Sequence, residues 1–456
     1  MRNKVSLLIS ILVVLGLLLT ACAAPAAQPT NAAPEGEQPA GEQPAGEKPF
    51  DGVTINIMME GVPDTEFVQE LLPQFQEETG MTVNIEVLNY ALMHEKLVPQ
   101  LTAGQGSGSY DAIVVDNYWV GEFVGAGWLM PLDDRLAASE SIKMENYLPS
   151  MVEMVGELNG QTYMVPFYNY AMALIYRTDV MEDAEVQAAY KEATGNDLAL
   201  PASIPEYVEL AKFMTRDTDG DGEVDFYGNS MQGLRPDPTV MEFLNYLYAM
   251  GGSIYAEDGS VAINNEIGVE ALTLYADAMA NAAPPGAPAY GFDEAYATMA
   301  QGDAFSYISY NWMVPQLNDP EKSQVVDKVA VVRVPGGAGL LGGWGWAIPN
   351  SSPNPDAAWA FFEWVESFEI AKERALLGGA PTRHDVFADA DVLAKYAHYS
   401  EVEQIVGEAI MFPILSRAPQ VVEVLGIAIS GVTSGETTVE AALETAAAEL
   451  ENLKDK

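Results

Sequence analysis

The sequence predicts an α/β fold, and three observations lead to this prediction. Stretches with strand periodicity alternate with stretches of helical periodicity over residues 53–115. Hydrophobic residues make up 49% of the 456 residues, and 15 Phe, 21 Tyr and 7 Trp supply ample material for a packed core. The length predicts two or three domains at about 150 residues each.

The first elements after Phe50 predict a parallel sheet. Residues 53–57 (VTINI) and 83–87 (VNIEV) alternate apolar and polar side chains, and residues 112–115 (AIVV) are continuously apolar, as in a buried parallel strand. Apolar residues at helical spacing lie between these strands, and Gly80 fits the end of the first helix. The order β-α-β-α-β predicts a doubly wound parallel sheet.

Further helices are predicted along the rest of the chain. Ser203 and Glu206 form a capping-box pattern before one helix, and residues 239–250 form another that ends at Gly251. Residues 361–368 place apolar side chains on one helical face, and the last helix is expected to open at Thr437. These apolar faces predict core packing and carry no chemistry.

The N-terminus predicts export and lipidation. Two basic residues precede the uncharged apolar residues 5–19, which are shorter than the ~20 residues of a membrane-spanning helix. Residues 1–21 therefore predict a signal peptide, and Leu19-Thr20-Ala21-Cys22 resembles a bacterial lipobox. Cys22, the chain's one cysteine, is then the lipid attachment point. An uncleaved anchor with an incidental cysteine is the alternative.

Residues 22–49 predict a disordered tether rich in Pro, Ala, Gly and Glu, with the GEQPA repeat at 36–45.

The formal net charge of −45 would repel phosphates and excludes nucleic acid as a partner. The protein is expected to act as a monomer on the outer face of the cell membrane, or in the periplasm.

Motifs for catalysis are missing from the sequence. The three histidines are far apart, and no HExxH, CxxC, GxSxG or Walker-type pattern occurs. No catalytic residue and no catalytic cofactor is therefore predicted. A pair of carboxylates for glycoside hydrolysis stays open, because 66 acidic residues allow many pairs.

One acidic loop predicts a structural calcium site. Residues 217–225 (DTDGDGEVD) match the first positions of an EF-hand loop, with Gly222 at the tight turn. The twelfth position is Gly228 and not the usual glutamate, so another ligand would have to complete the shell. An acidic, solvated turn is the alternative. The predicted ligands are Asp217, Asp219, Asp221, Glu223 and Asp225.

Aromatic residues beside amides predict a sugar site. The flat apolar face of a sugar ring stacks on Trp or Tyr, while its hydroxyls need planar polar partners. Such neighbours occur at Asn117 with Trp119 and at Asn311 with Trp312, and the GGWGW run of residues 342–346 places further aromatics beside glycines. Ligands of open α/β sheets bind beyond the carboxyl ends of strands, where Met59-Glu60-Gly61 and Asp116-Asn117-Tyr118-Trp119 are expected.

The chain resembles family 1 of the bacterial extracellular solute-binding proteins, which includes maltose-binding protein. Seven segments in order carry the resemblance: YDAIVVDNYWVGEFVGAGWLMPLDD (110–134), LNGQTYMVPFYNYAMALIYRTDV (158–180), PASIPEYVELAKFMT (201–215), DTDGDGEVDFYG (217–228), MAQGDAFSYISYNW (299–312), GGWGWAIPNSSPNPDAAWAFFEWV (342–365) and APTR (380–383).

The resemblance implies a two-lobed type II clamshell, with a doubly wound sheet flanked by helices in each lobe. Residues 50–168 and 333–378 would form the first lobe, and residues 169–332 and 379–456 the second. The chain would cross between lobes near 166–171, 333–335 and 378–382.

The resemblance also implies a function: capture of a mono- or oligosaccharide between the lobes and delivery to the permease subunits of an ABC transporter. A secreted glycoside hydrolase, a ligand-presenting sensor and a carrier of another solute are the alternatives. The implied ligand-binding residues are Glu60, Asp116, Asn117, Trp119, Tyr168, Tyr170, Trp312, Trp344 and Arg383.

Overall fold

The computed structural model describes residue 48 and residues 50–454. The predicted signal peptide, Cys22 and almost all of the tether lie outside the described residues. Within them, no helix is both long and apolar enough to cross a membrane.

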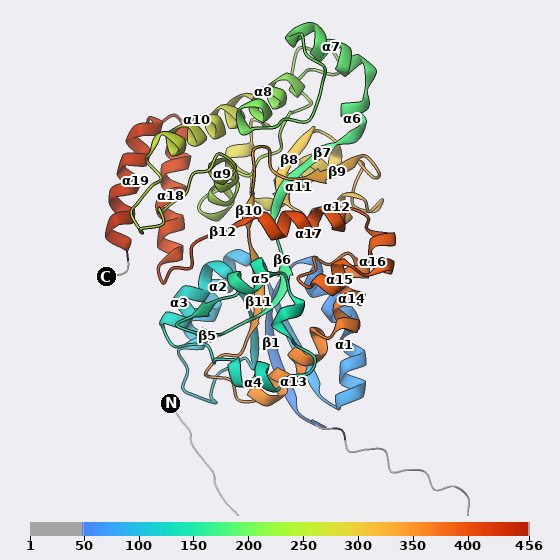
Figure 1. Ribbon diagram of the computed structural model, residues 1–456, viewed down its shortest axis with the longest axis vertical. Helices are drawn as coiled ribbons and strands as arrows, with labels where there is room; N and C mark the ends of the chain where they lie inside the picture. The colour runs from blue at the N-terminus through green and yellow to red at the C-terminus, as the bar shows by residue number, and fades with distance from the viewer. Residues whose placement is uncertain (1–47, 49, 455–456) are drawn as a thin grey trace, which may run out of the picture. The chain divides into compact units, whose positions relative to one another are not determined.

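The first lobe is built on a five-stranded mixed sheet in the order β2-β1-β3-β11-β6 (Figure 1). Its strands are β1 (Thr54–Glu60), β2 (Thr82–Leu88), β3 (Ala112–Asp116), β6 (Val165–Asn169) and β11 (Gly343–Ala347). The parallel pairing of β1 with β2 and β3 confirms the predicted β-α-β-α-β unit. The sheet is not wholly parallel, because β11 returns from the second lobe and runs antiparallel to both β3 and β6.

Helices on both faces cover this sheet. The first, α1, ends where Gly80 adopts a left-handed conformation, as the sequence predicts. Glu366 and Ser367 divide the predicted helical face of 361–368 into α13 and α14. The helices of this lobe are α1 (Pro63–Thr79), α2 (Tyr90–Leu101), α3 (Asn117–Gly125), α4 (Asp133–Ala138), α5 (Pro149–Met154), α13 (Pro355–Val365), α14 (Phe368–Leu377), α15 (His384–Phe387), α16 (Ala390–Lys395) and α17 (Tyr399–Glu408).

The second lobe is built on the antiparallel sheet β8-β7-β9. The sheet comprises β7 (Met172–Arg177), β8 (Ser306–Tyr310) and β9 (Val329–Val332), so the doubly wound sheet expected here is wrong. The strands are antiparallel because β7 leaves the first lobe and both partners run back toward it. The helices are α6 (Thr178–Glu182), α7 (Ala184–Thr194), α8 (Ile204–Met214), α9 (Asp237–Ala249), α10 (Glu266–Asn281), α11 (Phe292–Gln301), α12 (Met313–Leu317), α18 (Ala418–Thr433) and α19 (Val439–Leu453).

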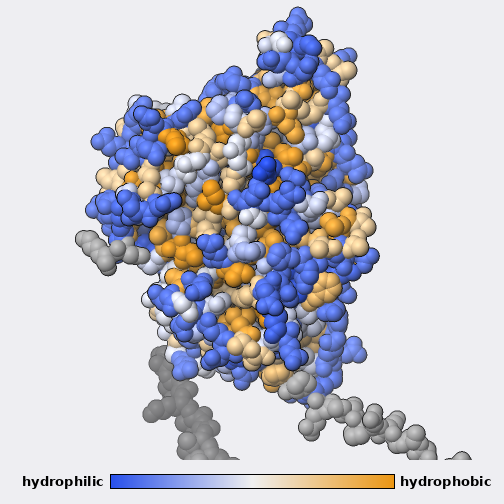
Figure 2. Space-filling model, viewed as in Figure 1, coloured by the Kyte–Doolittle hydropathy of each residue, from blue (hydrophilic) through white to orange (hydrophobic). Residues whose placement is uncertain are grey.

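Short elements complete the fold. The 3-10 turns are η1 (Met144–Asn146) and η2 (Ala287–Ala289), and the short strands are β4 (Glu157–Leu158), β5 (Gln161–Thr162), β10 (Leu340–Leu341) and β12 (Ile410–Met411). Ser203 caps α8 as predicted, whereas Thr438 and not Thr437 caps α19. The face seen in Figure 2 is mainly hydrophilic, with small scattered hydrophobic patches.

The lobes are joined by three crossings, and the third differs from its expected place. The first lies between β6 and β7 and the second between β9 and β11, close to the positions that the resemblance implies. Residues 379–383 stay with the first lobe, because the Asn169 amide donates to the Pro381 carbonyl at 2.7 Å and Ala380 N–H donates to Asp64 at 3.2 Å. The third crossing therefore follows α17, where β12 pairs with β10 before α18 packs on α9.

One buried acid in the second lobe has an incomplete set of partners. Glu242 of α9 is fully buried, and its Oε2 accepts a hydrogen bond from the Gln232 N–H at 2.7 Å. Its Oε1 has no hydrogen-bond partner among the described residues. Burial raises the pKa of this carboxyl well above its ordinary value, so the neutral form is favoured.

We predict that Glu242→Gln stabilises the protein increasingly as pH rises. A carboxyl with a raised folded-state pKa contributes stability below the unfolded-state value and loses it as pH rises toward the folded-state value. The free energy of unfolding of the variant relative to the parent should therefore grow between pH 5 and pH 8, by up to about 1.4 kcal/mol per pH unit. Urea unfolding at both pH values measures it. Glu192→Gln, on exposed α7, is the control, and a pH-independent difference would contradict the prediction.

Candidate ligand site between the lobes

Most of the predicted ligand-binding residues meet at one edge of the first sheet. Glu60 ends β1, Asp116 ends β3, and Trp344 at the start of β11 pairs with both Asp116 and Tyr168. This is the carboxyl edge of the parallel strands, where the sequence places a ligand. The structure thus brings together residues separated by up to 284 positions in the chain, counted from Glu60 to Trp344.

Glycines allow β11 to fit between β3 and β6. A Cβ atom on Gly342 would lie 1.6 Å from the ring of Tyr170, and one on Gly345 would lie 2.7 Å from the Cβ of Met164. Any other residue at position 342 would push the Tyr170 ring away. The glycines of the GGWGW run therefore have a packing role, while its two tryptophans differ: Trp346 packs in the core and donates to buried Glu366 at 2.9 Å.

Tyrosine hydroxyls bind the two carboxyl groups at this edge. The Tyr168 hydroxyl donates to Glu60, and the Tyr170 hydroxyl lies 2.9 Å from Asp116 Oδ1 and 2.8 Å from Asn117 Oδ1. Burial raises the pKa of Glu60 to about 8 and that of Asp116 to about 7, although these hydrogen bonds oppose the rise. Each carboxyl group can hydrogen-bond to a ligand, as an acceptor when it is ionised and also as a donor when it is neutral.

The aromatic rings of the first lobe form a continuous wall. Trp119 lies on the first turn of α3, which Asp116 caps, and packs edge-on against Trp344 at 5.2 Å between ring centroids. Tyr168 stacks on the other side of Trp344 at 6.2 Å. Trp119 and Trp344 are only 4% and 2% exposed, so a ligand could stack on them only after neighbouring groups move.

The second lobe faces this wall with aromatic residues and one acid. Trp312 stacks on Tyr310 at 6.2 Å, and Tyr310 packs edge-on against Tyr170 of the first crossing at 5.6 Å. Asp237, at the start of α9, accepts a hydrogen bond from the Tyr90 hydroxyl at 3.2 Å. We name the whole set the interlobe cluster, which comprises Glu60, Tyr90, Asp116, Asn117, Trp119, Tyr168, Tyr170, Asp237, Tyr310, Trp312 and Trp344.

The sequence prediction missed three members of this cluster. Tyr90 follows the carboxyl end of β2, just as Glu60 lies at the carboxyl end of β1. The rule for strand ends therefore points to Tyr90 as well, but the sequence prediction covers only the ends of the first and third strands. Tyr310 adjoins Trp312 in the segment that carries the resemblance. Asp237 had no local signal, because it is brought to the cluster by the packing of α9.

Arg383 does not join the interlobe cluster. Its guanidinium donates to Asp385 at 2.9 and 2.7 Å and to the Glu366 carbonyl at 2.6 Å. All three of its nitrogens are thus used within the first lobe, and its ring neighbour is Tyr147. The position of Arg383 supports a role in fixing residues 380–383 to the first lobe, and the expected ligand contact is not supported.

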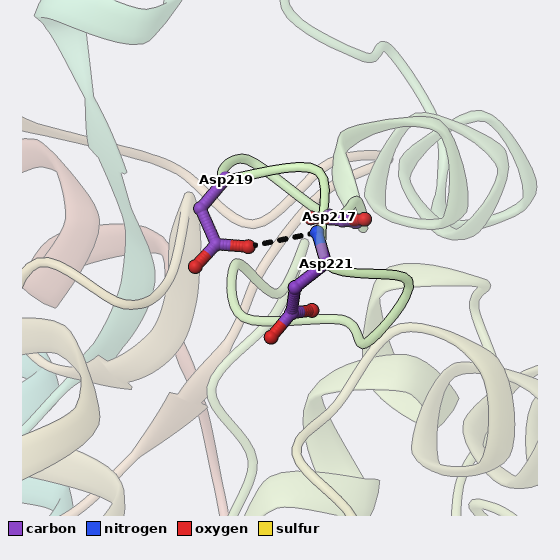
Figure 3. A group of neighbouring side chains, drawn as sticks. All are labelled: Asp217, Asp219 and Asp221. Atoms are coloured by element: carbon purple, nitrogen blue, oxygen red, sulfur yellow. Dashed lines mark hydrogen bonds between the residues drawn. The ribbon is translucent and has the colours of Figure 1, made fainter.

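The acidic loop after α8 brings together three of its five predicted ligands. Carboxylate oxygens of Asp217, Asp219 and Asp221 lie within 4.8 Å of one another (Figure 3). Asp217 accepts from Gly220 and Gly222 N–H groups, and these bonds lower its pKa. Glu223 and Asp225 lie outside this group. The Asp225 carboxylate instead accepts two hydrogen bonds from Thr218, which close the base of the loop.

Calcium binding by this loop stays a prediction. Three clustered carboxylates repel one another, and a divalent cation would remove the repulsion. Calcium should therefore raise the melting temperature of the parent protein relative to a chelator, and Asp219→Ala should abolish that rise. Asp258→Ala, in another exposed turn, is the control. An equal melting temperature with calcium and with chelator would contradict the prediction.

Comparisons with known proteins agree with this architecture. The family model of the bacterial extracellular solute-binding proteins matches residues 61–372, more than half of the chain. The chain therefore belongs to this family, whose members act outside the cytoplasm. The comparisons also support the two-lobed fold implied by the resemblance.

Particular relatives carry more specific names. The chain is 25% identical to a probable amino-acid ABC transporter periplasmic-binding protein of Sinorhizobium fredii, over 76% of this chain and 77% of that protein. It is 25% identical to a mannitol-binding protein of Pseudomonas aeruginosa, over 75% and 76% of the two chains.

Solved structures with a similar fold hold sugars or polyols. An ABC transporter solute-binding protein of Agrobacterium radiobacter in complex with ribitol has a TM-score of 0.78 and 28% identity, covering 89% of this chain and all of that one. Maltose-bound MalE3 of T. maritima has a TM-score of 0.76 and 26% identity, covering 88% of this chain and all of that one.

Proposed function

We propose that this protein captures an uncharged sugar or polyol in the interlobe cluster and delivers it to an ABC importer. The observation that carries the proposal is the meeting of tyrosine-bound carboxyl groups with the Trp119–Trp344 wall at one sheet edge. The ligands named for the relatives, which are mannitol, ribitol and maltose, support the same chemical class.

The chemistry of the cluster suits a ligand with many hydroxyl groups. Carboxylates accept hydrogen bonds from hydroxyls, tyrosine hydroxyls can donate or accept, and aromatic faces contact C–H groups. Asn117 is 3% exposed, and its Nδ2 donor has no partner among the described residues. A ligand hydroxyl at this amide would satisfy a buried donor that otherwise costs stability.

The charge of the cluster disfavours anionic ligands. Desolvation, tyrosine hydroxyls and neighbouring acids dominate the surroundings of Glu60 and Asp116, and no Lys or Arg is among the main groups that act on them in the described structure. The carboxylate of an amino acid or of a uronic acid would lack a cationic partner here and would meet these acids. The amino-acid name of one relative is for this reason not carried over.

We propose binding without catalysis. A glycoside hydrolase needs one carboxyl poised as an acid and another as a base or nucleophile, each facing the scissile bond. Here Glu60 and Asp116 end neighbouring strands and each accepts a hydrogen bond from a tyrosine. Membership of a solute-binding family supports a binding role. Hydrolysis therefore enters the test below as the competing outcome.

The place of action follows from the N-terminal segment. We propose that a lipid on Cys22 and the predicted tether of residues 22–49 hold the folded lobes, as a monomer, near permease subunits at the membrane. A ligand-presenting sensor with the same fold would need the same lipid anchor, so anchoring does not distinguish a sensor from a carrier. Replacing Cys22 by Ala should move the protein from the membrane fraction to the medium or periplasm, and unchanged membrane association would contradict lipidation.

The function is tested with a soluble version that starts at Glu47. Calorimetric titration and tryptophan fluorescence should show saturable binding of at least one of ribitol, mannitol and maltose, and none of glutamate or glucuronate. Asp116→Asn keeps the size of the side chain but weakens its hydrogen bonds, so affinity should fall about tenfold or more. Asp356→Asn, on the surface, is the matched control.

The outcomes of this experiment are distinct. Binding without release of glucose from maltose supports a carrier. Product formation would replace the carrier with a hydrolase. Binding of glutamate or glucuronate in preference to the neutral ligands would overturn the charge argument, and equal loss in both variants would remove Asp116 from the site.

A further inference from the structure

One hydrogen bond in the interlobe cluster joins the two lobes directly. The Tyr90 hydroxyl lies 3.2 Å from Asp237 Oδ1. Tyr90 opens α2 immediately after β2 of the first lobe. Asp237 opens α9, which packs on β8 of the second lobe. The two residues are 147 positions apart in the chain and meet only through the approach of the lobes.

The ring of Tyr90 is fixed within the first lobe. It stacks on Trp119 with centroids 5.2 Å apart and planes 20° apart, and it packs edge-on against Trp344 at 6.1 Å. These contacts persist whatever the second lobe does, because all three rings belong to the first lobe. The hydroxyl makes the hydrogen bond across the boundary to Asp237, and it also acts on Asp116 of its own lobe.

Asp237 benefits from this partner because its carboxyl group is buried beside other acids. Burial is the main cause that raises its pKa, and Glu423 of α18 raises it further. Asp116 lies near enough across the boundary for the two carboxyl groups to influence each other. His94 of α2 acts in the opposite sense, but it is paired with Glu122 at 2.7 Å. The Tyr90 hydroxyl therefore provides the direct stabilisation of the Asp237 carboxyl.

We propose that the Tyr90–Asp237 hydrogen bond is a latch that holds the lobes together and slows release of a bound ligand. The proposal rests on the proposed function, since a latch matters only if a ligand is enclosed. A ligand held between the lobes beside Tyr90 and Asp237 leaves when the lobes separate, and that separation breaks the latch. Tyr90 and Asp237 are then positioning residues that control the lifetime of the closed form.

The latch is tested by release kinetics of the soluble protein, loaded with whichever of ribitol, mannitol and maltose it binds. Tyr90→Phe keeps the ring stack and removes the donor, and Asp237→Ala removes the acceptor. Each should speed release about tenfold in stopped-flow tryptophan fluorescence. The double variant should release no faster than either single one, and Asp237→Asn, which keeps an acceptor oxygen, should stay near the parent rate.

Tyr110→Phe is the matched control, because the Tyr110 hydroxyl donates to a carboxylate, Glu86, at 2.6 Å within the first lobe alone. Release from Tyr90→Phe at the rate of Tyr110→Phe would overturn the latch. Additive effects in the double variant would also overturn it, since they would mean that the two residues contact the ligand separately.

A second measurement separates failure of the latch from failure of the proposed function. Small-angle X-ray scattering of the protein alone reports the separation of the lobes without any ligand. The latch predicts a larger radius of gyration for Tyr90→Phe and Asp237→Ala than for the parent and Tyr110→Phe. Equal radii would overturn the latch, whereas absence of sugar binding with unequal radii would overturn the proposed function alone.

Discussion

The insertion of β11 between β3 and β6 is the constraint on which the rest of the structure depends. A strand that returns from the second lobe becomes the fourth strand of the first sheet, antiparallel to both neighbours. Its register sets Trp344 opposite Asp116 and Tyr168, and Gly342 leaves room for the ring of Tyr170. The same strand therefore connects the lobes and assembles the candidate site.

Burial at this edge sets the electrostatics of the site. Acids at the ends of β1 and β3 lose water, and tyrosine hydroxyls replace part of it. The loss of water raises the pKa values of Glu60 and Asp116 toward neutrality, although the tyrosine hydrogen bonds oppose this rise. Each carboxyl group can still make further hydrogen bonds to a ligand. Approach of the second lobe adds a further acid, Asp237, whose hydroxyl partner comes from the first lobe. In the proposed function, closure and binding would therefore involve the same groups.

Local patterns in the sequence predicted the parts of the fold that depend on local physics. The apolar residues of β3 and the glycine that ends α1 follow strand and helix rules, and Asp116 and Glu60 follow from the rule for strand ends. The return of β11, the antiparallel second sheet and the late third crossing depend on contacts between distant segments. Arg383 lies apart from the other predicted residues for the same reason: its contacts with Asp385 and Glu366 leave no mark in the sequence. Asp237 was missed because α9 delivers it from the other lobe.

The central claim is that a neutral, hydroxyl-rich ligand binds at the carboxyl edge of the first sheet. A crystal structure of the soluble protein with the tightest-binding ligand of the panel tests it most directly. We expect ligand hydroxyls within hydrogen-bond distance of Asp116 and Glu60, and carbon atoms against Trp119 or Trp344. A ligand bound elsewhere, such as in the surface groove beside Arg135 and Trp359, would contradict it.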